Sequence, residues 1–262
     1  MSLLTLVNII VEIYKIEINI NLFLISIKTI NINSFDLSSI FWKKILDNSF
    51  LKIKPYQAEF FKKIDSLDKL RVQSSYNTGS ISSTTAWLLF SIVLFFKPKI
   101  IVEIGSFIGK STFSMALAAD FNLTENSCDI FCCDYSNEIK FPNIAKTKIK
   151  QFHKTSSTEM FKELDVNLNI DLIHVDGRLE VEDCILLKEK INDNTFFIMD
   201  DFEGNEKGVA NLFHLLNNNV ISRAKYCVIY PIDNLVGKTY GLIEKSTTAV
   251  LLPIKFLKIT SQ

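Results

Sequence analysis

The sequence has few cysteines, and their spacing is not that of a metal site. There are 5 cysteines in 262 residues, an odd number, and no two of them form a C-x-x-C pair. This argues against a disulfide framework and against a zinc knuckle. Cys132 and Cys133 are adjacent within an apolar run, where small buried residues are the ordinary interpretation. We infer a reducing compartment and expect a cytoplasmic protein.

The sequence also has no net charge. The 29 basic and 29 acidic residues give a formal net charge of +0, and the basic residues are scattered without an arginine-rich stripe. Nothing predicts a surface for polyanions, so an RNA substrate has no support and no nucleic-acid partner is expected. Long apolar runs are absent as well. Ala86 to Phe96 is intensely apolar but too short to span a membrane, so it predicts a buried helix.

The first segment, Met1 to Asn33, lacks a basic n-region and a small-residue cleavage site, so it is a poor signal peptide. Polar residues interrupt it too often for a membrane span. Ile16 to Leu24 alternates as a strand would. Three interpretations stay open for this segment: an accessory strand pair, a partner-binding element or a poorly ordered stretch.

The stretch that organises the chain is Lys99 to Thr112, KIIVEIGSFIGKST. Its β-branched run predicts a strand buried on both faces. Gly105 and Gly109 indicate a tight turn, and Ser111 and Thr112 open a segment with helical periodicity, Phe113 to Ala119. A strand, a glycine turn and a helix start form the first unit of a nucleotide-binding α/β fold. Glycine lets a backbone approach a ligand closely, and a helix start offers free N–H groups.

The glycine spacing separates two cofactor classes. A dinucleotide site reads G-x-G-x-x-G with an acid about 20 residues further on. Here Glu103 precedes Gly105 and Gly109, which gives E-x-G-x-x-x-G. This resembles the first motif of class I S-adenosylmethionine-dependent methyltransferases, in which the acid and the glycines hold the methionine end of the cofactor. The alternative is a glycine turn in an unrelated α/β protein.

Four further apolar runs predict strands, and three of them end in carboxylates. Asp134 follows the second strand, Asp176 the fourth, and Asp200 with Asp201 the fifth. Ligands bind at the carboxyl ends of parallel strands, so these side chains are expected at one edge. The predicted strands are Cys128 to Cys133, Ile149 to His153, Ile170 to Val175 and Thr195 to Met199.

Two of these positions keep more than one interpretation. Asp134 could accept hydrogen bonds from ribose hydroxyls, which we favour, or it could cap a helix or lie in a solvated turn. Ser156 and Ser157 precede a helix-like segment and are first of all N-cap candidates. In the resembled family this loop also lies against the adenine ring, and the sequence does not decide between the two roles. His153 is interpreted as a strand-end residue.

The run D-x-I-H-x-D-G in the fourth strand and the D-D pair after the fifth are similar to methyltransferase family 24, a branch close to catechol-type and macrolide-sugar O-methyltransferases. The run DDFEGNEKGVAN also matches, with Gly208 and Val209 opening a helix. In metal-dependent relatives these acids hold Mg²⁺, which implies a metal site at Asp176, Asp200 and Asp201. Carboxylate oxygens are the ligands that Mg²⁺ prefers, and the metal would lower the pKa of a substrate hydroxyl.

The sequence departs from this family at one motif. The family continues D-G-x-H-x-Y, but Leu179 and Val181 stand at those positions. In some relatives that histidine is a general base, and aliphatic side chains cannot replace it. Another base, metal activation alone or a weakened catalytic role all remain open. We assign Asp176 and Arg178 as catalytic candidates, Arg178 either binding an anionic substrate or being solvated, and we expect neither His174 nor His214 to act.

The regions on either side of these motifs predict accessory structure. Ser34 to Leu70 predicts two helical runs separated by Pro55. In the resembled family such helices often cover the active site or build a dimer interface, which implies a homodimer as one option. Tyr226 to Tyr230 and Tyr240 to Ile243 read as a closing hairpin. We expect an N-terminal extension over 1–78 and a cofactor-binding domain over 79–262.

The sequence thus predicts a three-layer, Rossmann-like α/β fold with a mostly parallel sheet closed by an antiparallel hairpin. The resemblance implies an S-adenosylmethionine-dependent transferase, most simply an O-methyltransferase of a small-molecule hydroxyl. An NAD-dependent enzyme on a related sheet and a catalytically inactive, ligand- or partner-binding relative are the rivals. The predicted cofactor-binding residues are Glu103, Gly105, Ser106, Gly109, Ser111, Thr112, Asp134, Ser156, Ser157 and Asp176.

Overall fold

The computed structural model describes residues 34–73, 79–122, 127–138, 147–203 and 206–257. The chain divides into two compact units, Met1–Leu37 and Ser38–Gln262, and the second unit contains the sheet. The interpretations offered for Met1 to Asn33 lie outside the described residues. The predicted boundary between residues 78 and 79 stays a prediction.

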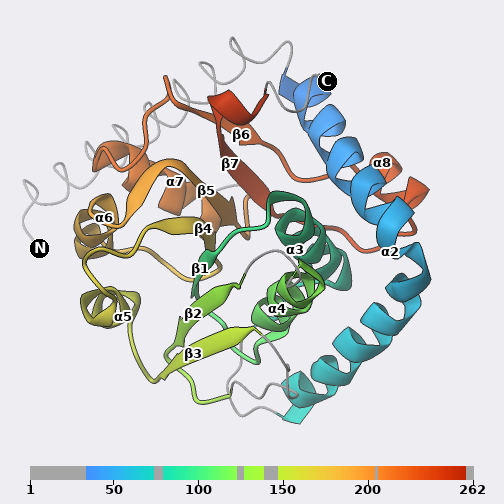
Figure 1. The fold of residues 1–262 in the computed structure, drawn as a ribbon, viewed down its shortest axis with the longest axis horizontal. Coiled ribbons are helices and arrows are strands. Elements are labelled where there is room, and N and C mark those ends of the chain that lie inside the picture. Colours follow the sequence, from blue (N-terminus) through green and yellow to red (C-terminus); the bar gives the residue numbers. More distant parts are fainter. Residues whose placement is uncertain (1–33, 74–78, 123–126, 139–146, 204–205, 258–262) are drawn as a thin grey trace, which may run out of the picture. The chain divides into compact units, whose positions relative to one another are not determined.

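A seven-stranded sheet runs through the second unit in the order β3-β2-β1-β4-β5-β7-β6 (Figure 1). The first five strands pair in parallel, and β7 pairs antiparallel with both β5 and β6. The predicted sheet class is confirmed. The strands are β1 Ile100–Ile104, β2 Asp129–Asp134, β3 Lys148–His153, β4 Ile170–Val175, β5 Ile191–Met199, β6 Tyr226–Ile229 and β7 Ala249–Pro253.

Helices cover both faces of this sheet (Figure 1). On one face α3 packs against α4, and on the other face lie α5, α6 and α7. The apolar run predicted as a buried helix is α3, whose N-cap Ser82 accepts a hydrogen bond from Thr85 N. The helices are α2 Ser34–Gln73, α3 Ser83–Phe96, α4 Lys110–Asn122, α5 Ser157–Glu163, α6 Val181–Lys188, α7 Lys207–Asn217 and α8 Asn234–Thr239.

The prediction of two helical runs before the sheet is wrong, because α2 continues through Pro55 as one helix. Proline removes one backbone donor and its ring crowds the preceding turn. Apolar packing on both sides of Pro55 offsets that cost, since Ile53 and Phe60 are both buried. The Phe60 ring lies 5.0 Å from the ring of Trp87 on α3, centroid to centroid. The buried face of the helix therefore fixes its direction across the proline.

The closing hairpin forms, but its second strand is not the one predicted. Tyr226–Ile229 pairs with Ala249–Pro253, whereas Tyr240 to Ile243 lies in a turn after α8. Ala249–Pro253 is buried at every position, while Ile243 is 85% exposed. The more continuously apolar run therefore fills the place between β5 and β6.

The described residues settle two further features. All five cysteines are free, four of them buried and Cys227 half-buried. Within the described ranges, no helix combines the length and the apolar character needed to cross a bilayer.

Candidate functional site

The glycine turn after β1 is fastened to the strands on both sides of it. The N–H groups of Gly105 and Ser106 donate to the carbonyl oxygen of Cys133 at the end of β2, at 3.0 and 3.2 Å. The N–H groups of Asp176 and Gly177 donate to the carbonyl oxygen of Ile104, at 2.9 and 2.8 Å. These bonds bring the turn and the ends of β2 and β4 together at one edge of the sheet, as the sequence predicted.

Glycine is required in this turn by its conformation and by its close packing. Gly105 and Gly109 have φ of 87° and 82°, in the left-handed region. A Cβ at Gly105 would lie 2.7 Å from the backbone nitrogen of Gly177, closer than a carbon contact allows. The two turns pack backbone against backbone, so a side chain at Gly105 would push them apart.

Asp134 lies at this edge with both carboxylate oxygens oriented by the backbone. Oδ2 accepts from Phe107 N at 2.8 Å, and Oδ1 accepts from Ser136 N at 2.7 Å. Its carbonyl oxygen accepts from Thr155 N at 3.1 Å, which holds the loop before α5 at the same edge. The carboxylate is half-buried, and each oxygen keeps a second lone pair for a ligand hydroxyl.

Glu103 lies beneath the turn and has no exposed surface. Its carboxylate accepts a hydrogen bond from Thr112 Oγ1 on α4 and pairs with His174 Nδ1 on β4 at 2.9 Å. Burial lowers the pKa of His174, and the hydrogen bond and charge of Glu103 outweigh burial, so the pKa rises. Glu103, Thr112 and His174 thus form a buried network that joins β1, β4 and α4 and supports the turn from below.

The start of α4 is covered by the accessory helix. Lys110 is buried, and its ammonium pairs with Asp68 of α2 at 2.8 Å. Ser106 and Ser111, two of the predicted cofactor residues, are also buried, and Ser106 Oγ donates to the Cys133 carbonyl oxygen at 3.2 Å. Helix α2 therefore packs beside the glycine turn as well as against α3.

The two serines predicted near the adenine ring form the start of α5. Ser156 is the N-cap: its Oγ accepts from Glu159 N at 3.1 Å, and Glu159 accepts in return from Ser156 N at 2.9 Å. Ser157 is buried and its Oγ donates to Asp183 of α6 at 2.7 Å. The N-cap interpretation is confirmed for Ser156, while contact with adenine stays a prediction.

At the ends of β4 and β5, a lysine joins two of the predicted metal ligands. Lys207 Nζ lies 2.6 Å from Asp176 Oδ1 and 2.9 Å from Asp201 Oδ2. Burial and then the charge of Asp200 raise the pKa of Asp176, the charge and hydrogen bond of Lys207 lower it, and the net result is a pKa of about 7. Burial lowers the pKa of Lys207, and the two carboxylates outweigh it, so this pKa lies above its ordinary value.

The third predicted metal ligand faces elsewhere. Asp200 is buried, and its Oδ1 accepts a hydrogen bond from Oγ1 of Thr248, the residue before β7, at 2.8 Å. Across the described ranges, no three His, Cys, Asp or Glu side chains are grouped to hold a metal ion. The Mg²⁺ site predicted at Asp176, Asp200 and Asp201 therefore does not fit: an ammonium lies between two of the carboxylates, and a threonine hydroxyl binds the third.

The residues that follow Asp176 after β4 differ in their exposure to solvent. Arg178 is exposed in the turn beside Asp176. Leu179, at the position of the family histidine, is buried, and its N–H donates to Asn211 Oδ1 at 2.9 Å. Asn211 also donates to the Gly177 carbonyl oxygen at 2.9 Å. The sequence reasoning missed Lys207 and Asn211, although both lie in the run DDFEGNEKGVAN that carried the resemblance.

Comparison with known families decides the class of this site. The family described as "Methyltransferase domain", Methyltransf_24, matches residues 102–202, from within β1 to just after β5. Residues 102–202 form a family 24 methyltransferase domain. The class is that of S-adenosylmethionine-dependent methyltransferases, as the glycine motif implied. No curated protein matches the sequence.

Solved structures share the fold of this methyltransferase at low sequence identity. A Staphylococcus aureus protein described as a caffeoyl-CoA O-methyltransferase is 15% identical over 79% of this chain and 99% of that chain, with a TM-score of 0.50. A Bacillus cereus O-methyltransferase in complex with S-adenosylhomocysteine is 13% identical over 73% and 90%, with a TM-score of 0.50. A Klebsiella pneumoniae protein described as an O-methyltransferase is 11% identical over 72% and 89%, with a TM-score of 0.50.

The residues at this edge suit S-adenosylmethionine. Asp134 and Asp176 present half-buried carboxylates on the two sides of the glycine turn. Such oxygens accept hydrogen bonds from ribose hydroxyls and from an ammonium group. When bound, the cofactor supplies a methyl group on a positively charged sulfur. The Glu103 carboxylate, also in the predicted set, is instead enclosed by Thr112 and His174.

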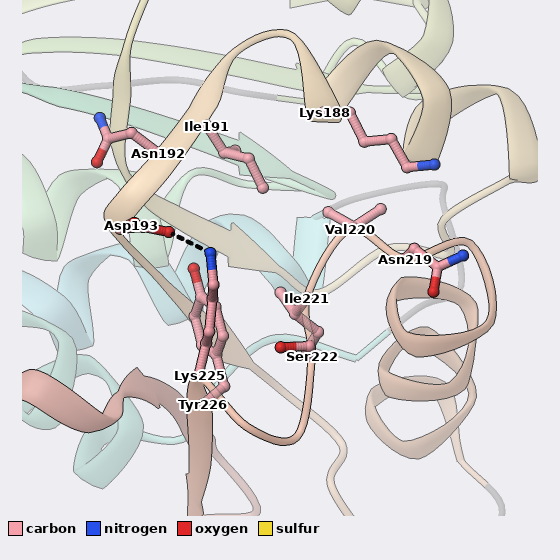
Figure 2. A pocket seen from close by; sticks show the side chains of 10 residues that line it. All are labelled: Lys188, Ile191, Asn192, Asp193, Asn219, Val220, Ile221, Ser222, Lys225 and Tyr226. Atoms are coloured by element: carbon pink, nitrogen blue, oxygen red, sulfur yellow. Dashed lines mark hydrogen bonds and ion pairs between the residues drawn. The ribbon is translucent and has the colours of Figure 1, made fainter.

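A pocket elsewhere in the methyltransferase does not belong to this site. It has a volume of about 350 Å³ and lies at the amino end of β5 (Figure 2). Asp193 and Lys225 pair in it at 3.0 Å. The amino and carboxyl ends of a strand are at opposite edges of the sheet, so this pocket lies away from Asp134 and Asp176.

Proposed function

We propose that this methyltransferase transfers a methyl group from S-adenosylmethionine to the hydroxyl oxygen of a small-molecule acceptor. The observation that carries the proposal is the edge at which the glycine turn, Asp134 and Asp176 meet. The O-methyltransferases that share the fold support oxygen as the acceptor atom. Sugar, phenol, fatty acid and peptide hydroxyls all fit this chemistry.

The reaction asks the protein for alignment more than for covalent chemistry. The acceptor oxygen must approach the methyl carbon opposite the sulfur, and holding the pair in that line can supply a large part of the acceleration. The carbon–sulfur bond breaks as the carbon–oxygen bond forms, S-adenosylhomocysteine leaves, and the hydroxyl proton of the acceptor passes to a basic group or to water at the site. We assign the half-buried carboxylate of Asp176 to the acceptor side of the site, and Arg178 to an anionic group of the acceptor.

The test is a calorimetric titration of the full chain with S-adenosylhomocysteine, with NAD as the comparison ligand. We expect micromolar binding of S-adenosylhomocysteine and none of NAD. The variant Gly105→Arg should abolish this binding, because the new side chain enters the contact between Gly105 and Gly177. Gly79→Arg is the matched control, since nothing lies within 4 Å of a Cβ there. Normal binding by Gly105→Arg would show that the site is misplaced.

One observation favours a second candidate, a relative that binds the cofactor without turnover. Leu179 is buried at the position of the family base, and its backbone is fixed by Asn211. Transfer of a labelled methyl group to a panel of phenol, sugar, fatty acid and peptide hydroxyls separates the candidates. Product from any acceptor excludes the inactive relative, and cofactor binding without product from any class favours it.

A further inference from the structure

We propose that the ammonium group of Lys207 takes the place between Asp176 and Asp201 that a divalent cation holds in metal-dependent relatives, so that this methyltransferase works without a metal. The conclusion that catalysis needs no metal rests on the proposed function. The position of the ammonium rests on the contacts of Lys207 with Asp176 and Asp201.

The hydrogen-bonding capacity of the Lys207 ammonium is fully used by Asp176 and Asp201. The lysine ammonium has three N–H donors. Nζ lies 2.6 Å from Asp176 Oδ1, 2.7 Å from the Asp176 carbonyl oxygen and 2.9 Å from Asp201 Oδ2. The three donors thus meet three oxygens of the predicted metal ligands, namely one carboxylate oxygen each of Asp176 and Asp201 and the carbonyl oxygen of Asp176. The cation position is already filled by a covalently attached charge.

The backbone around Lys207 holds the lysine in this position. Lys207 is the first residue of α7, and Gly208 follows it. A Cβ at Gly208 would lie 2.4 Å from the Asp200 carbonyl oxygen, so only glycine lets the helix start this close to the end of β5. Asp201 itself has a φ of 49°, a left-handed conformation that Asp tolerates better than most residues. The approach of α7 fixes the lysine against both carboxylates.

Asp200 cannot join the other two carboxylates without breaking its own hydrogen bond. Its Oδ1 binds Thr248 Oγ1 at 2.8 Å, and that hydroxyl lies 3.2 Å from Thr85 Oγ1 on α3. A divalent cation at this place would also meet the Lys207 charge at contact distance, where like charges repel strongly. The arrangement excludes a metal by occupancy, by geometry and by charge.

Lys207 is therefore a positioning residue. Its three donors are used within the protein, so it orients the two turns that follow β4 and β5 and neutralises their carboxylates. Magnesium would do the same and would also bind the acceptor oxygen. In this protein the acceptor must be oriented by other groups at the edge.

The experiment is a titration of the full chain with Mn²⁺ alone, a paramagnetic substitute for Mg²⁺. Binding is monitored through the electron paramagnetic resonance signal of the free ion. We expect no tight binding by the wild type or by Lys225→Ala, whose lysine forms the exposed pair with Asp193. Lys207→Ala should gain Mn²⁺ affinity by about tenfold or more, because it leaves two carboxylates without a cation. Circular dichroism confirms that each variant is folded.

Two results would overturn the inference. One is micromolar Mn²⁺ binding by the wild type that Lys207→Ala does not strengthen. The other is S-adenosylhomocysteine affinity of the wild type that changes about tenfold or more between Mg²⁺ and a chelator. This second measurement decides the matter even if Lys207→Ala fails to fold. Absence of S-adenosylhomocysteine binding in both conditions would sink the proposed function, while the Mn²⁺ titration of the wild type would still test the lysine.

Discussion

The two ends of strand β5 each carry an aspartate paired with a lysine, and the two pairs differ in what surrounds them. At the amino end, the side chains of Asp193 and Lys225 are 72% and 65% exposed. At the carboxyl end, Lys207 is 27% exposed and meets two carboxylates. Water screens the first pair and competes for its bonds, whereas the second is partly removed from water. The same two residue types thus form an exposed ion pair at one end and a partly buried one, which joins two turns, at the other.

The largest effect is expected from disturbing the backbone contact between Gly208 and Asp200, which holds Lys207 against its two carboxylates. Gly208→Ala should destabilise the protein by about 1–3 kcal/mol or more, because its Cβ would lie 2.4 Å from the Asp200 carbonyl oxygen and the two segments must separate. Gly79→Ala is the control, with nothing within 4 Å of its Cβ. Urea unfolding measures both. Equal midpoints for the two variants would show that the approach of α7 to β5 is looser than described.

A smaller effect is expected from removing each ammonium in turn. Lys207→Ala leaves Asp176 and Asp201 unpaired in a half-buried place and should cost about 2 kcal/mol of unfolding free energy. Lys225→Ala should leave the unfolding midpoint near that of the wild type, because its pair is exposed. The measurement is urea unfolding of both variants and the wild type at one pH. If Lys225→Ala lost more unfolding free energy than Lys207→Ala, the exposed pair would be the more stabilising of the two, contrary to this prediction.

A further effect is a change in the pH dependence of stability. The folded-state pKa of Asp176 is raised to about 7 from 3.8, so the folded state binds this proton more tightly than the unfolded state. Its contribution to stability is therefore present at low pH and is lost as pH rises from about 4 to about 7. Asp176→Asn should remove that loss, so the variant gains stability relative to the wild type between pH 5 and pH 8.

Asp193→Asn is the matched control for this measurement. The hydrogen bond and charge of Lys225 lower the pKa of Asp193 below 3.8, so its contribution is lost only as pH falls through that lower range. Between pH 5 and pH 8 its difference from the wild type should be flat. Unfolding midpoints at several pH values test both variants, and a flat difference for Asp176→Asn would contradict the raised pKa.

Much of the fold could be read from the sequence because its central strands carry strong local signals. Strands β1, β4 and β5 are buried at nearly every apolar position of their predicted runs. Short, continuous apolar runs of this kind are typical of parallel strands that are covered on both faces. The second strand of the hairpin could not be read in this way. Tyr240 to Ile243 has the composition of a strand, yet Ala249–Pro253 fills the place beside β5. Short apolar runs compete for one position, and packing selects among them.

The site divides in the same way. The glycine turn and the carboxylates at the strand ends were predictable from the sequence, since they follow from neighbouring residues and a fixed strand direction, and the methyltransferase class followed from the resemblance of the motifs there. Only the tertiary structure decided what those carboxylates face. Lys207 reaches Asp176 across 31 residues of sequence, and Asp200 reaches Thr248 across 48. Contacts at that separation depend on where a helix and a strand are packed, and no local pattern encodes that placement.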